Sequence, residues 1–61
     1  MKMKFVEDFD DKRKAGYEVT VDKIRYAPGA TGSYVVRVVS EWKRPQWLAI
    51  GWFIHPNTDE N

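Results

Sequence analysis

The segment YEVTVDKIRY, residues 17–26, decides the fold class, because its side chains alternate as those of a β-strand do. Apolar and aromatic residues recur at every second position, and polar residues stand between them. Val, Ile and Tyr are also the residue types enriched in strands. The segment therefore predicts a strand of about ten residues with one buried face.

The alternation in this segment changes phase once. Val19 and Val21 occupy odd positions, whereas Ile24 and Tyr26 occupy even ones. A repeat of two residues changes phase only where one strand carries an extra residue. The sequence therefore predicts a β-bulge or a sharp bend near Asp22-Lys23, which would curl the sheet.

Two further segments have the same character. Residues 33–42 and 46–55 are rich in Val, Ile, Tyr and Trp. The loop at residues 27–32 contains Pro and Gly, and the short connection at residues 43–45 ends in a proline. Short loops between long strands favour an antiparallel meander.

The fold class predicted from these segments is mainly β: a small curled antiparallel meander. It is either an SH3-like barrel or a sheet of three to four strands, with residues 3–6 as a short additional strand. Residues 1–55 are expected to form one small β domain, and residues 56–61 a flexible, polar C-terminal tail.

Residues 8–15 allow two interpretations. They begin with acidic and end with basic side chains, and Gly16 follows them, which is the order of a short helix capped by Asp8. A helix of this length is marginal on its own, so a solvated loop is the alternative. The sequence leaves both open.

The third segment is apolar on both of its expected faces. One face carries Leu48, Ile50, Trp52 and Ile54, and the other carries Trp47, Ala49, Gly51, Phe53 and His55. A strand with one solvated face alternates instead. The second face must be covered by a curled sheet or a helix, or it remains exposed as a binding surface. A second copy of the chain is one candidate partner for such a surface.

Composition restricts the chemistry that the chain can support. Its 61 residues contain no Cys and one His, which argues against disulfides and a metal site. No P-loop motif or relay of Ser, His and an acid is apparent, so the chain is predicted to be no enzyme and to use no cofactor. No signal peptide or membrane-spanning run is visible, which favours a cytoplasmic protein without membrane contact.

Charge is distributed unevenly along the chain. Eight Lys or Arg and only three acidic residues lie in residues 12–55, giving this part a net charge of +5, whereas the whole chain carries +1. Such a distribution weakly favours an anionic partner.

These patterns predict a small non-enzymatic protein-binding module. The predicted contact residues are Trp47, Phe53 and Arg37, with Lys43 and Arg44 at the rim. Aromatic residues and Arg dominate interface hot spots. The alternative is a nucleic-acid-binding domain that uses basic residues and exposed Trp side chains. Its small size also fits a phage or mobile-element inhibitor of a host factor.

Overall fold

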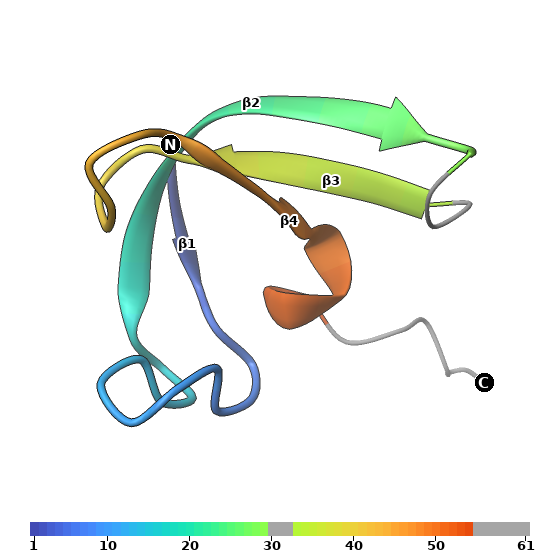
Figure 1. Cartoon of the computed structure of the whole chain (residues 1–61). Helices are drawn as coiled ribbons and strands as arrows, with labels where there is room; N and C mark the ends of the chain where they lie inside the picture. Colours follow the sequence, from blue (N-terminus) through green and yellow to red (C-terminus); the bar gives the residue numbers. More distant parts are fainter. Residues whose placement is uncertain (30–32, 55–61) are drawn as a thin grey trace, which may run out of the picture.

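The computed structural model describes residues 1–29 and 33–54, and they form one four-stranded antiparallel sheet (Figure 1). The strands are β1 (Lys2–Lys4), β2 (Glu18–Ala27), β3 (Ser33–Val38) and β4 (Gln46–Ala49), in the spatial order β1-β2-β3-β4. A short 3-10 turn, η1 (Ile50–Trp52), follows β4. The predicted antiparallel meander is confirmed as an open sheet, not a closed barrel.

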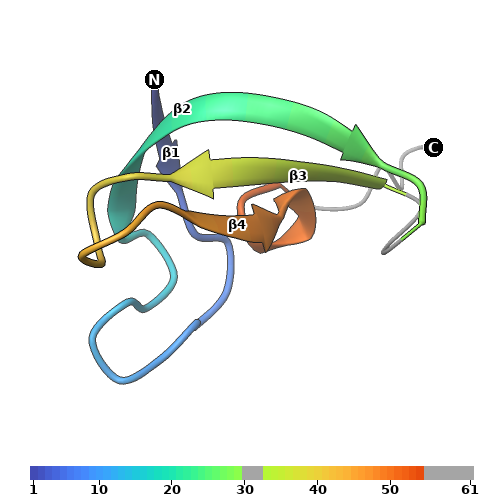
Figure 2. The ribbon, with the colours of Figure 1, turned by 45° about the horizontal axis from the view of Figure 1, so that its top comes forward.

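The predicted β-bulge is also confirmed. Val21 pairs with Val38 and Lys23 pairs with Arg37, so Asp22 is the extra residue in β2. Before the bulge β2 pairs with β1, and after it β2 turns and runs alongside β3 (Figure 2). Because Asp22 is an extra residue, Ile24 lies on the same face as Val21, although three positions separate them in the sequence.

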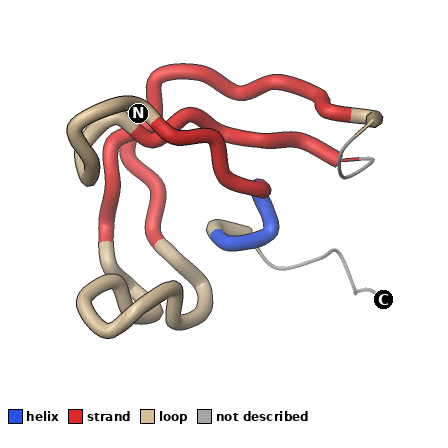
Figure 3. The backbone as a smooth tube through the Cα atoms, in the orientation of Figure 1, coloured by secondary structure: helices blue, strands red, loops and turns tan. Residues whose placement is uncertain are grey.

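Residues 8–15 form a loop and not a helix (Figure 3). Asp10 Oδ1 accepts the backbone N–H groups of Lys12, at 3.0 Å, and Arg13, at 2.6 Å. Asp8 Oδ1 accepts the N–H of Ala15 at 2.9 Å. Short acidic side chains that bond nearby backbone stabilise turns in competition with a helix. The loop alternative is therefore correct.

Both later strands are shorter than the sequence predicts. The strand expected over residues 33–42 ends at Val38, and the one expected over residues 46–55 ends at Ala49. In η1 the N–H groups of Phe53 and Ile54 both donate to Ile50 O, at 2.8 and 3.2 Å. This turn rotates the chain, so residues beyond Ala49 no longer alternate between two sheet faces. The predicted tail, residues 56–61, and His55 lie outside the described residues.

The core lies between the sheet and the segments that close over its inner face. Its buried members are Phe5, Val19, Val21, Val36, Val38 and Phe53. The ring centroid of Phe5 lies 4.6 Å from that of Phe53 and 5.1 Å from that of Phe9. Trp52 packs edge-on against both Phe5 and Phe9. Large aromatic side chains thus supply the buried area that so short a chain needs.

Candidate binding surface

The face of the sheet opposite the core carries two cross-strand rows of side chains. Register places Lys23, Arg37 and Trp47 in one row, and Arg25, Val35 and Ala49 in the next. We call these six residues the outer sheet face. They come from three strands, so backbone pairing, and not side-chain packing, fixes their relative positions.

Trp47 stands between two arginines on this face. The guanidinium carbon of Arg25 lies 4.9 Å from the ring centroid, and that of Arg37 lies 5.9 Å from it. Both distances permit cation–π attraction. The Trp47 side chain remains 38% exposed, so the ring is held in place and yet accessible.

The arginines beside Trp47 differ in their ion pairs. Arg37 makes a two-pronged pair with Asp22, with Nε 2.8 Å from Oδ1 and NH2 2.5 Å from Oδ2. This hydrogen bonding lowers the pKa of the Asp22 carboxyl and raises the pKa of Arg37. Among residues 1–29 and 33–54, no carboxylate lies within ion-pair distance of Lys23 or Arg25. The charge available to a partner is therefore that of Lys23 and Arg25.

The structure brings together only part of the predicted contact set. Trp47 and Arg37 are neighbours, as expected. Phe53 is 5% exposed and belongs to the core, so the expectation that it shares an exposed face with Trp47 is wrong. The 3-10 turn is the reason, because it carries Phe53 out of the strand and onto Phe5.

Lys43 and Arg44 are exposed in the connection that precedes β4. Sequence reasoning missed Lys23 and Arg25, although the phase change near residue 22 was the signal that could have found them. Once an extra residue is placed at the bulge, both fall on the same face as Arg37.

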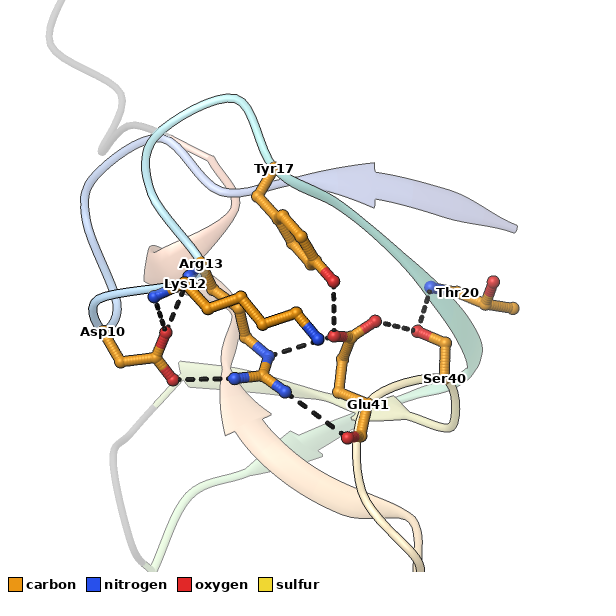
Figure 4. A network of polar contacts seen from close by, with 7 residues as sticks. All are labelled: Asp10, Lys12, Arg13, Tyr17, Thr20, Ser40 and Glu41. Atoms are coloured by element: carbon orange, nitrogen blue, oxygen red, sulfur yellow. Dashed lines mark hydrogen bonds and ion pairs between the residues drawn. The ribbon is translucent and has the colours of Figure 1, made fainter.

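A second polar cluster joins the loop at residues 6–17 to the connection between β3 and β4 (Figure 4). Arg13 is 9% exposed, and its guanidinium binds Asp10 Oδ2 at 2.8 Å and Glu41 Oε1 at 3.0 Å. The same guanidinium lies 4.8 Å from the ring of Trp42. The hydroxyl of Tyr17 donates to Glu41 Oε1 at 2.8 Å.

This cluster keeps the carboxylate of Glu41 charged. Burial alone would raise the pKa of Glu41, but hydrogen bonds from Ser40, Tyr17 and Arg13 outweigh burial and lower it. The bond to Glu41 and burial together raise the pKa of Tyr17. With its oxygens occupied, Glu41 is suited to holding two loops together and not to accepting a proton from a substrate.

The described part of the chain contains no pocket and no group of three or more side chains placed to hold a metal ion. No helix in residues 1–29 and 33–54 has the length and apolar character needed to cross a membrane. The outer sheet face is therefore an open surface without a pocket among the described residues.

In comparisons with known proteins, no family model, no curated protein and no solved structure matches this chain.

Proposed function

We propose that this chain is a non-enzymatic protein-binding module whose contact surface is the outer sheet face. The observation that carries the proposal is Trp47, exposed on a sheet and flanked by Arg25 and Arg37. Trp and Arg are the residue types that contribute most to protein interfaces. Val35 and Ala49 extend the contact area with an apolar strip beside the charged row.

Two features favour a protein partner over a nucleic acid. Guanidinium groups already lie against the Trp47 ring, so a base would have to displace them before it could stack. Glu18 also lies on this side of the sheet, where it would repel a phosphate backbone.

Nucleic-acid binding is the second candidate, and a different observation favours it. Lys2 and Lys4 in β1 lie on the same side of the sheet as Lys23 and Arg25, which extends the positive charge across two strands. Such a surface would bind phosphates with an affinity that falls steeply as salt increases.

A paired experiment separates the two candidates. Lysate proteins are captured with the wild type, Trp47→Ala and the control Ile54→Ala, which removes an apolar residue that is 48% exposed and lies after the 3-10 turn, outside the outer sheet face. Our proposal predicts a protein that the wild type and the control retain and Trp47→Ala loses. Intrinsic fluorescence is then titrated with single- and double-stranded oligonucleotides at two salt concentrations. Saturable, salt-sensitive quenching without a Trp47-dependent protein would replace the first candidate with the second.

A further inference from the structure

Within residues 1–29 and 33–54, the second half of β2 has a neighbouring strand on one side only. β1 pairs with β2 from Glu18 to Thr20, and the last bonds on this side join Met1 to Val21. From Asp22 to Tyr26 only β3 pairs with β2 in the described structure, and Figures 1 and 2 show β2 along the margin of the sheet beyond β1. An unpaired strand edge is a template for another extended chain. We call residues 22–26 the open edge.

The side chains of the open edge alternate in chemistry. Lys23 and Arg25 are exposed on the outer face and lack a carboxylate partner among the described residues. Ile24 and Tyr26 are 45% and 53% exposed on the opposite face, beside buried Val36. An added strand would therefore meet positive charge on one face and apolar surface on the other.

A second copy of this chain fits the open edge poorly. In a two-fold antiparallel pairing centred on Ile24, Lys23 would stand opposite Arg25 of the second copy. A pairing centred on Arg25 would oppose two copies of that residue. Parallel pairing in register opposes each cation to itself. Like charges directly opposite one another destabilise a strand pair, so charge selects against self-pairing.

We propose that the open edge binds an extended segment of a partner protein that alternates acidic and apolar residues. Its carboxylates, two residues apart, would face Lys23 and Arg25, and its intervening apolar side chain would cover Ile24 or Tyr26. Backbone hydrogen bonds would supply affinity, and the side chains would supply selectivity. This inference rests on the proposed function and specifies the partner's chemistry, because Arg25 also contacts Trp47 on the outer sheet face.

The test uses labelled synthetic peptides and the full chain, with binding followed by fluorescence anisotropy. One peptide alternates glutamate and valine, and a second alternates lysine and valine. Two further versions of the acidic peptide carry N-methyl groups on alternate amides, in either phase. We expect the acidic peptide to bind at least about tenfold more tightly than the basic one, since two ion pairs form and two repulsions are avoided. One N-methylated version should lose binding, because it lacks the donors that face the edge.

Charge reversal provides the matched control. In the double variant Lys23→Glu and Arg25→Glu the preference should invert towards the basic peptide. The matched variant Lys12→Glu and Lys14→Glu makes the same change in charge on the exposed loop at residues 8–15, and it should keep the original preference. Circular dichroism of both variants shows whether the sheet is intact.

Several results would overturn the inference. These are no peptide binding, equal binding by both double variants, or equal binding by both N-methylated peptides. Tighter binding of an oligothymidine than of the acidic peptide would assign the cations to phosphate instead. Any of these results together with a Trp47-dependent protein partner leaves the proposed function standing. If no Trp47-dependent partner is found but the acidic peptide still binds the open edge, the proposed function fails and the open-edge inference stands.

Discussion

Replacing Phe53 by alanine tests the arrangement of the C-terminal turn and core. Phe53 is 5% exposed, and its ring lies 4.6 Å from that of Phe5. Truncation of a buried Phe to Ala costs about 3–5 kcal/mol. A chain of 61 residues has a total stability of roughly 3–9 kcal/mol at the usual stability per residue. Phe53→Ala should therefore lose between about a third and all of the total free energy of unfolding.

The matched variant is Trp47→Ala, which removes a larger aromatic side chain from the same part of the sequence. Because Trp47 is 38% exposed on the outer sheet face, its removal leaves no closed cavity. We expect a loss of no more than about 2 kcal/mol, with a folded sheet. Urea titration followed by circular dichroism measures both free energies of unfolding. Equal losses in the two variants, or a loss of less than about 2 kcal/mol in Phe53→Ala, would refute the placement of these residues.

Three further variants test other parts of the structure. Val36→Ala should lower the free energy of unfolding by about 2–3 kcal/mol in urea titrations, because Val36 is fully buried. Val35→Ala, one residue earlier on the outer face, should lower it by less than about 1 kcal/mol. Similar losses in the two variants would mean that β3 presents its faces differently. Gly16→Ala should cost about 1–2 kcal/mol in the same assay, since Gly16 has φ +92°, and a neutral result would argue against this turn. The lowered pKa of Glu41 means that the folded state binds a proton at this carboxyl more weakly than the unfolded state does. The contribution of Glu41 to the free energy of unfolding is therefore complete well above the ordinary pKa of 4.5. It is lost as the pH falls through the pKa of the folded state. Glu41→Gln should therefore flatten the pH dependence of stability in that acid range, and an unchanged slope in denaturation at several pH values would contradict the network in Figure 4.

The parts of the fold that sequence predicts well depend on local alternation. The bulge in β2 follows from the opposite phases of Val21 and Ile24, because only an inserted residue keeps both on one face. The start of β4 is equally clear from Pro45, which cannot donate to a strand ladder.

The end of β4 depends on packing that alternation does not report. The residues Ile50 to Phe53 read as a strand, but the turn at η1 lets Phe53 reach Phe5, about fifty positions earlier in the chain. The burial gained through that distant contact outweighs the local β preference. The apparent second apolar face of the last strand is therefore partly core.

The sequence predicts only part of the candidate binding surface. Trp47 and Arg37 share a face in the observed register, in which they pair directly, whereas a shift of one residue would separate them. Lys23 and Arg25 join them only after the bulge is placed to the residue, which sequence alone located no better than Asp22-Lys23. The buried pair of Arg13 and Glu41 joins two loops, and no sequence period links those positions.

The dissociation constant of the Trp47-dependent partner, measured by titration calorimetry against the wild type and Trp47→Ala, tests the central claim most directly. If the outer sheet face is the working surface, the variant should bind about thirtyfold or more weakly while keeping the circular dichroism spectrum of the wild type. Equal affinity of the two proteins would contradict the claim and place the contact elsewhere on the molecule.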